Sequence, residues 1–380
     1  MIKLSLTKVE NLFKLGENIL FKINLSRKKF ILSFILALLE SRSVEFPEIA
    51  HHLNDEVEVS SNMRRIQRFF AEYSLDYRQF AILFMSFIPE KKYRLCIDRT
   101  NWKFGCKSIN IFALTVYYKG IGIPILFEML EKSGNSNQEE RIFLLERFVA
   151  IFGHKCIKSL LADREFIGEK WFHFLVEKGI KFHIRIPKSH YFSYTNEKQR
   201  ADFFLNKYGK KKLIRIFYQN LDLYLAMDFS KNKQGQTDPV FILTNEKNRN
   251  ALRIYKQRWS IEVFFQSLKG RGFKFEKTHL KDTDRIAKLF VLASLTFIIC
   301  LCTGIYYDAL EKKIPIKNHG YKAKSFFRYG ADILRNVLKK IEKSQDEFNK
   351  IIALITGFAS SVFEICLKRT ILEVQIKNVM

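Results

Sequence analysis

Residues 93–130 read YRLCIDRTNWKFGCKSINIFALTVYYKGIGIPILFEML and contain three apolar runs in close succession. The first run, Tyr93–Ile97, is followed by Asp98, and a Lys-Gly pair separates the other two, Ile109–Tyr118 and Ile121–Leu130. Short apolar runs bounded by turn residues are typical of buried β-strands, and a Lys-Gly pair between two of them indicates a hairpin. This stretch therefore predicts three strands that follow one another directly.

Helices and strands are expected to alternate beyond this stretch. Apolar residues at helical spacing predict a helix at Gln138–Phe152, which a glycine ends. The run Cys156–Ala162 predicts a strand that stops at Asp163, and a helix at Glu169–Lys178 and a strand at Lys181–Ile186 follow. The order β-β-β-α-β-α-β is that of the ribonuclease H-like α/β fold.

The segments before and after this core have a different pattern of apolar and polar residues. Strand-sized runs between polar loops predict a mostly β insertion at about residues 188–247. The N-terminal and C-terminal regions are expected to be helical. The chain is therefore expected to divide into residues 1–88, residues 89–310 with the β insertion, and residues 311–380.

The charge of the chain points to an anionic partner. Its 380 residues carry a formal net charge of +26, and such an excess repels itself in a compact state unless a polyanion neutralises it. Nucleic acid is the first candidate and a membrane surface the second, while a lysine-rich coding bias would require no partner. The six cysteines form no CxxC pair, which predicts reduced thiols and a cytoplasmic location.

One run, Leu289–Tyr307, carries no charged residue. Its length permits a membrane span. It contains serine, threonine and glycine, however, and it follows directly on a segment rich in polar residues. A helix buried in a large core is the favoured interpretation, and no membrane is expected as a partner.

The N-terminal region contains a candidate DNA-reading element. A short helix at Phe46–Leu53, a strand-like run at Val57–Val59, and a helix that Ser60 or Ser61 caps and that runs to about Tyr73 are typical of a helix-turn-helix-like module. An ordinary helical bundle with a solvated basic face is the alternative. The candidate DNA contacts on the second helix are Arg64, Arg65 and Arg68.

A helix expected at about residues 248–269 carries four polar residues in one line. At about 100° per residue, their side chains fall within about 60° of one another. The residues between them are mostly apolar, so the line faces a polar site on an otherwise buried helix. The four residues are Tyr255, Arg258, Glu262 and Lys269.

Three carboxylates come from separate segments of this arrangement. Asp98 and Asp163 each follow an apolar strand, at the sheet rim where α/β proteins place ligands, and Glu262 belongs to the polar line. Their repulsion in a half-buried site requires cations. Two Mg²⁺ or Mn²⁺ ions suit oxygen ligands and support phosphoryl transfer. Taken singly, a strand-end aspartate more often only caps a turn.

The other members of the polar line suit contacts with DNA. Arg258 can fork onto a phosphate, and Lys269 can contact one as a point charge. Tyr255 can donate a hydrogen bond to a phosphate or stack on a base. The basic residues nearby, Arg253 and Lys256 among them, extend this positive track, although taken alone they would more often be a solvated face.

These residues together resemble a known family. The spacing Tyr-x2-Arg-x3-Glu-x6-Lys of the polar line is similar to the YREK signature of IS4-family DDE transposases. The segments IDRTNWKFG around Asp98 and LADREF around Asp163 resemble the aspartate motifs of that family. The short segments at 134–136 and 278–280 are also similar to sequences of that family, and the resemblance covers about residues 90–310.

The resemblance implies the transposase of a bacterial insertion sequence that acts by cut-and-paste. Asp98, Asp163 and Glu262 would hold two metal ions, and the enzyme would cleave double-stranded DNA at terminal inverted repeats and join it to target DNA. Relatives act as homodimers in the DNA complex and bind their ends through a helical N-terminal domain, so a dimerisation role is a candidate for residues 311–380 and a nucleoid-associated location is expected.

One departure concerns the β insertion. Some relatives form a hairpin at the transposon end and stack a flipped base on a tryptophan of the insertion, but residues 188–247 contain no tryptophan. Aromatic substitutes there include Tyr191, Phe192, Tyr194 and Tyr224. Two alternatives to an active transposase are a catalytically inactive or repurposed DNA-binding derivative and a nuclease on the same fold.

Overall fold

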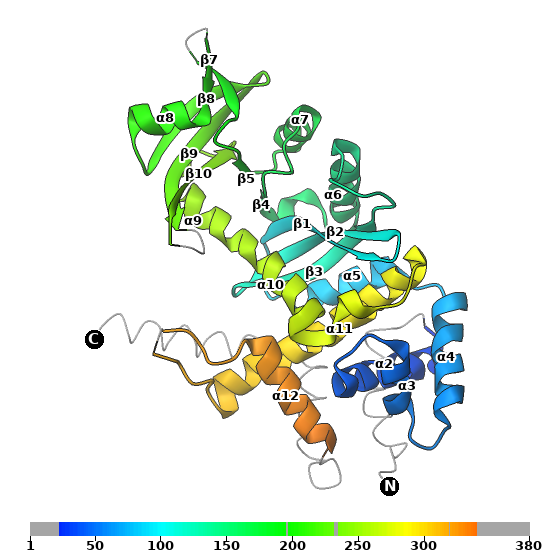
Figure 1. Ribbon diagram of the computed structural model, residues 1–380. Coiled ribbons are helices and arrows are strands. Elements are labelled where there is room, and N and C mark those ends of the chain that lie inside the picture. Colours follow the sequence, from blue (N-terminus) through cyan, green and yellow to red (C-terminus); the bar gives the residue numbers. More distant parts are fainter. Residues whose placement is uncertain (1–22, 195–196, 232–234, 319, 340–380) are drawn as a thin grey trace. The chain divides into compact units, whose positions relative to one another are not determined.

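The computed structural model describes residues 23–194, 197–231, 235–318 and 320–339. The chain forms two compact units, one of Glu90–Phe264 and one of Met1–Pro89 together with Phe265–Met380. We call them the sheet unit and the helical unit and describe each by itself (Figure 1). The functional boundaries expected near residues 88 and 310 stay a prediction.

The sheet unit is built on one ten-stranded mixed sheet with the order β3-β2-β1-β4-β5-β10-β9-β8-β6-β7. Its first half is an antiparallel meander of β1 (Tyr93–Phe104), β2 (Lys107–Tyr118) and β3 (Ile121–Met129). Two strands, β4 (Ile157–Ala162) and β5 (Phe182–Ile186), extend it from β1 in parallel. This order confirms the ribonuclease H-like α/β fold.

Tight turns join the strands of the meander. Lys119 and Gly120, between β2 and β3, both have positive φ, at 46° and 86°, as a type I′ hairpin turn requires. The expected hairpin is therefore confirmed. The expected end of the first strand at Asp98 was wrong, because β1 continues its antiparallel pairing with β2 as far as Phe104.

Two helices connect the parallel strands. Helix α6 (Gln138–Phe152) begins with a capping box in which the Asn137 side chain accepts a hydrogen bond from the Glu140 backbone, and the Glu140 carboxylate accepts one from the Asn137 backbone. Helix α7 (Glu169–Glu177) buries an apolar face that includes Trp171. Both helices lie within one residue of their expected bounds.

The second half of the sheet is the expected β insertion. Strand β10 pairs in antiparallel fashion with both β5 and β9, so the insertion continues the core sheet directly (Figure 1). Its elements are β6 (Tyr191–Tyr194), β7 (Glu197–Arg200), α8 (Ala201–Tyr208), β8 (Lys212–Tyr218), β9 (Leu221–Lys231) and β10 (Thr237–Thr244).

The described part of the helical unit consists mainly of helices around α11. By length and composition alone, the helix Thr283–Glu311 could cross a membrane, but 94% of its most apolar stretch is buried inside the protein. Within the unit α11 contacts α2, α4, α5 and α12, which is the environment that a core helix requires. The helices are α2 (Leu25–Ser41), α3 (Phe46–Leu53), α4 (Val59–Glu72), α5 (Tyr77–Ser86), α11 (Thr283–Tyr306) and α12 (Phe326–Lys339).

Helices α3 and α4 form the expected pair joined by a short turn. The buried Asn62 of α4 donates hydrogen bonds to the carbonyl oxygens of Ala50 and Asn54, at 3.0 and 2.9 Å, and so ties the turn to both helices. The three basic residues expected on α4 lie on its exposed surface, and they are Arg64, Arg65 and Arg68.

Two details of this turn differ from expectation. Residues 57–59 form no strand; they complete the turn and begin α4. Ser60 and Ser61 do not cap the helix, because they lie within its first turn and the N-cap residue is Glu58, which makes no capping hydrogen bond. The Ser-Ser pair suggested a cap two or three residues too late.

Candidate active site

Asp98 and Asp163 lie where one parallel ladder ends. Strands β1 and β4 pair up to Ile97 and Ala162, and the two aspartates are the next residues of each chain segment. They therefore occupy neighbouring positions at the same edge of the sheet. The juxtaposition expected from two strand ends is present, although β1 itself runs on beyond Asp98.

The segment that carries the polar line is not one continuous helix. Helix α9 (Ala251–Tyr255) passes through a 3-10 turn at Lys256–Arg258 into α10 (Trp259–Leu268), and a π-helical turn at Lys269–Phe273 follows. The single regular helix expected over residues 248–269 was therefore wrong. The tighter turn is where the segment passes from the β insertion to the core sheet (Figure 1).

The first turn of α10 is fixed on the meander by close backbone packing. A Cβ atom at Gly122 of β3 would lie 3.0 Å from the Ser260 carbonyl oxygen and 3.1 Å from Ile261 Cα, so only glycine allows this approach without displacement. The Ser260 hydroxyl also lies 3.7 Å from Cys96 Sγ on β1. These contacts hold Glu262, two residues further on, beside the strand that carries Asp98.

Arg258 joins the three carboxylates and Tyr255 into one network. Its Nη1 donates to Asp98 Oδ2 at 3.0 Å, and its Nη2 donates to Glu262 Oε1 at 2.5 Å. Its Nε donates to the Tyr255 hydroxyl at 3.2 Å, and that hydroxyl donates to Asp163 Oδ1 at 3.3 Å. Five residues that the sequence singled out thus form one connected group within the sheet unit.

Burial and mutual charge shift the proton affinities in this group. Burial raises the pKa of Asp98 to about 7, against the opposing effect of Arg258. Burial also raises the pKa of Tyr255 to about 12. Burial alone would lower the pKa of the Arg258 guanidinium, but the negative groups around it raise the pKa above its ordinary value, so Arg258 is the fixed positive charge of the site.

The carboxylates are bridged by Arg258 and Tyr255 in this structure. Among the residues that the structure describes, no three His, Cys, Asp or Glu side chains gather in a metal-holding group. The donor set still fits a hard divalent cation, because it consists of carboxylate oxygens whose negative charge the single Arg258 guanidinium compensates only in part. Asp98, Asp163 and Glu262 are the residues that could hold such an ion.

A further polar group, which the sequence did not reveal, fixes the loops beside both aspartates. Arg99, next to Asp98, donates to Glu165 Oε1 at 2.7 Å and to Asn135 Oδ1 at 2.6 Å. Arg141 of α6 donates to the Glu165 carbonyl oxygen at 2.8 Å. The only signal in the sequence is that Arg99, Asn135 and Glu165 lie within the segments that resemble family motifs.

Lys269 is placed differently from the other members of the polar line. It lies in the helical unit, in the π-helical turn, and forms an ion pair with Glu276 at 2.6 Å. The N-terminal arginines also belong to the helical unit. A DNA-contacting role for Lys269 and for Arg64, Arg65 and Arg68 therefore stays a prediction.

The aromatic residues of the β insertion differ in exposure. Phe192 is buried at 1% exposure in a ring cluster with His190, Phe204 and Tyr218, which leaves it no face for a base. Tyr191 is 54% exposed, and Tyr224 is half-buried. The side chain of Tyr194 lies outside the described residues.

Two comparisons with known proteins gave matches. A family model described as a transposase DDE domain matches residues 89–299, and this range includes the whole network around Arg258. Among solved structures, the cryo-EM structure of the piggyBac transposase synaptic complex with hairpin DNA matches with 11% identity and a TM-score of 0.41, covering 92% of this chain and 82% of that one. None of the curated proteins searched matched the sequence. Because the family model covers more than half of the chain, the chain belongs to the transposase DDE domain family.

Proposed function

We propose that the protein is the transposase of an insertion sequence of the IS4 family, which cleaves DNA at the ends of its element and joins them to target DNA by cut-and-paste. Membership of the DDE family implies metal-dependent phosphoryl transfer on DNA. The observation that carries the finer proposal is the network in which Arg258 and Tyr255 join the carboxylates of Asp98, Asp163 and Glu262.

In this proposal Asp98, Asp163 and Glu262 are the catalytic residues and the metal ligands. Members of the family use divalent metal ions, and Mg²⁺ or Mn²⁺ suits these oxygen donors. Two bound ions would activate the attacking oxygen and stabilise the leaving oxygen at a phosphodiester. The two aspartates come from adjacent strands and the glutamate from the helix packed on them, so the fold supplies the donors from rigid elements.

Arg258 and Tyr255 have two tasks in the proposed site. Before a cation arrives, the Arg258 guanidinium partly neutralises Asp98 and Glu262, which would otherwise repel each other more strongly at partial burial. Both side chains are also donors suited to phosphate oxygens. A DNA phosphate that reaches the site would therefore find an arginine already held in place.

Binding of the element ends is assigned to other parts of the chain. The exposed Arg64, Arg65 and Arg68 on α4 would contact the terminal inverted repeats, and Lys269 would contact the DNA backbone near the polar line. Duplex DNA is the partner, and the net charge of +26 supports it. We also propose that a homodimer acts in the DNA complex and that the protein works in the bacterial cytoplasm at the nucleoid.

A strand-transfer assay tests this function. The protein is incubated with Mg²⁺, DNA that carries the two ends of its own element, and a supercoiled target. We expect cleavage and joined products from the unmodified protein, and a loss of roughly a thousandfold or more in Asp163→Asn and Glu262→Gln. The matched control is Glu177→Gln, which changes an exposed glutamate of the same unit.

The possible results separate the alternatives. Cleavage without joining would identify a nuclease on the same fold, and end binding without any cleavage would identify a DNA-binding derivative. Normal Mg²⁺-dependent cutting by Asp163→Asn would refute the site assignment. A loss in Glu177→Gln as large as in Asp163→Asn would show that the assay reports charge alone.

A further inference from the structure

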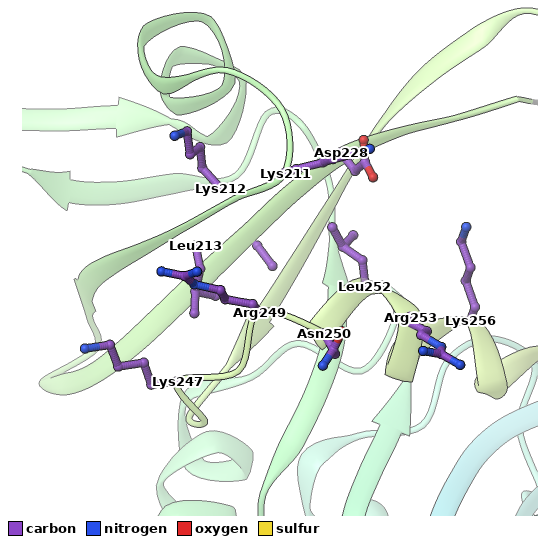
Figure 2. Close-up of a pocket in the computed structure, with 11 residues that line it drawn as sticks. Lys211, Lys212, Leu213, Asp228, Lys247, Arg249, Asn250, Leu252, Arg253 and Lys256 are labelled. Atoms are coloured by element: carbon purple, nitrogen blue, oxygen red, sulfur yellow. The ribbon is translucent and has the colours of Figure 1, made fainter.

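A wide basic groove opens in the sheet unit between the β insertion and the helix that leads to the active site. Its volume is about 900 Å³, enough for many atoms of an extended ligand. Figure 2 shows lining side chains from the start of β8 and the residue before it, from β9, and from the segment that runs from the loop before α9 to the first residue of the 3-10 turn after it. Its six cationic residues are all exposed, and they are Lys211, Lys212, Lys247, Arg249, Arg253 and Lys256.

The fold brings these cations together from two distant parts of the chain. Helix α9 packs its apolar side, with Ala251 and Tyr255, against Ala226, Val240 and Ile242 of the sheet. Arg253 and Lys256 of the same segment are exposed and also line the groove; both are labelled in Figure 2. The floor between the two sets of cations is partly apolar, since Leu213 and Leu252 line it.

The positive charges in the groove have little compensation from acidic residues that line it. One acidic residue, Asp228, lines it, and none of the six cations forms an ion pair with any residue that the structure describes. Elsewhere in the insertion such pairs do occur, as between Arg215 and Asp222 at 2.9 Å. Six like charges around one concavity raise its potential and attract anions from solution.

We propose that this groove binds the phosphodiester backbone of DNA as a second contact, separate from the catalytic network. The inference rests on the proposed function, because it assumes that DNA is the substrate. Arg253 and Lys256 lie on the same short segment as Tyr255 and Arg258, so a backbone held in the groove runs close to the carboxylates. Spaced lysines and arginines over an apolar floor suit a chain of phosphates and sugars better than one small anion.

A salt titration of binding tests the groove directly. The triple variant Lys211→Gln, Arg249→Gln, Arg253→Gln removes three of its charges, and the control Lys92→Gln, Lys107→Gln, Lys155→Gln removes three exposed charges of the same unit that do not line it. Binding of the full-length protein to a fluorescent duplex of arbitrary sequence is measured in EDTA over a range of salt concentrations. The absence of metal keeps cleavage out of the measurement.

We expect the slope of log K against log salt to become shallower by about 2–3 in the groove variant, since each phosphate contact contributes about 0.9 to that slope. The control should change the slope by less than about 1. An unchanged slope in the groove variant, or an equal change in both variants, would refute the groove as a DNA site. Equal melting temperatures of the three proteins would exclude unfolding as the cause.

Two further measurements extend the salt titration. The first repeats it with a single-stranded probe: if the groove variant changes the salt slope only for this probe, the groove binds an unpaired strand and not a duplex. The catalytic variant Asp163→Asn should keep the full salt slope. If the protein never cuts or joins DNA but the groove variant still loses slope, the proposed function fails and the groove stands as a DNA-binding site.

Discussion

The network around Arg258 and the basic groove use opposite arrangements of charge on one short segment of chain. In the network the Arg258 side chain is 9% exposed, and Asp98 and Glu262 accept its hydrogen bonds. In the groove the cations are exposed and face a single aspartate. The charges of the network are partly neutralised within the protein, whereas those of the groove must be neutralised from outside. Removing a cation from the network should therefore destabilise the fold, whereas removing one from the groove should weaken only the binding of DNA.

Arg258→Ala should show the largest stability effect of this comparison. It leaves Asp98 and Glu262, 18% and 27% exposed, without their shared partner. Because breaking one side of a buried pair is costly and partial exposure reduces that cost, we expect a loss of roughly 2–4 kcal/mol in the free energy of unfolding. Chemical denaturation measures it.

A matched change in the groove supplies the contrast. Arg253→Ala removes an exposed arginine five residues earlier and should change the free energy of unfolding by less than about 0.5 kcal/mol. Arg258→Lys keeps the positive charge but loses the forked donors of the guanidinium, so we expect an intermediate loss in the free energy of unfolding. Equal losses in Arg253→Ala and Arg258→Ala would abolish the distinction between the two regions.

Addition of Mg²⁺ should act differently on the two regions. A cation that binds the carboxylates would stabilise Arg258→Ala more than the unmodified protein, by roughly 1–3 kcal/mol in the free energy of unfolding at saturation, because it replaces the missing positive charge. Thermal unfolding with and without Mg²⁺ measures this without any DNA. The groove variant Arg253→Ala should respond as the unmodified protein does, and an identical response of all three proteins would contradict a cation site at these carboxylates.

The ion pair of Arg99 and Glu165, which holds the loops beside the two aspartates, should show a smaller effect on stability. Arg99 and Glu165 are 11% and 21% exposed and form an ion pair at 2.7 Å. A double-mutant cycle of Arg99→Ala and Glu165→Ala should give a coupling energy of about 1–2 kcal/mol. The same single changes should lower DNA cleavage and leave the salt slope of binding unchanged. A coupling energy near zero would mean that the loops after the aspartates are held by other contacts.

Much of the core followed from local sequence patterns, because apolar runs and turn residues report directly on strands. The hairpin at Lys119-Gly120 and the β insertion were expected and are present. The end of β1 was missed, because residues beyond Asp98 pair with β2 without being strongly apolar. The polar line on the predicted helix contained the residues that meet in the network, namely Tyr255, Arg258 and Glu262. The prediction of one regular helix was wrong, because a 3-10 turn interrupts it.

What the sequence could not show depends on tertiary pairing. Lys269 fits the line by spacing, yet it lies in a π-helical turn and pairs with Glu276. The groove joins Lys211 to Arg249 and Arg253 across a long stretch of chain, and only the pairing of β8 with β9 and the packing of α9 bring them together. A pattern read along the chain contains neither of these contacts.

Tyr255→Phe should show the smallest effect and sharpens the boundary between the two regions. The change removes the hydroxyl that links Arg258 to Asp163 and keeps the ring packed on Ala226 and Val240. We expect a loss of about 1 kcal/mol in the free energy of unfolding, the net contribution of one hydrogen-bonding group, with Tyr224→Phe as a control in the insertion. Tyr255→Phe could lose no more free energy of unfolding than Tyr224→Phe while Arg258→Ala still loses several kcal/mol, as expected above. In that case Tyr255 does not connect Asp163 to the network, which then consists of Arg258 with Asp98 and Glu262.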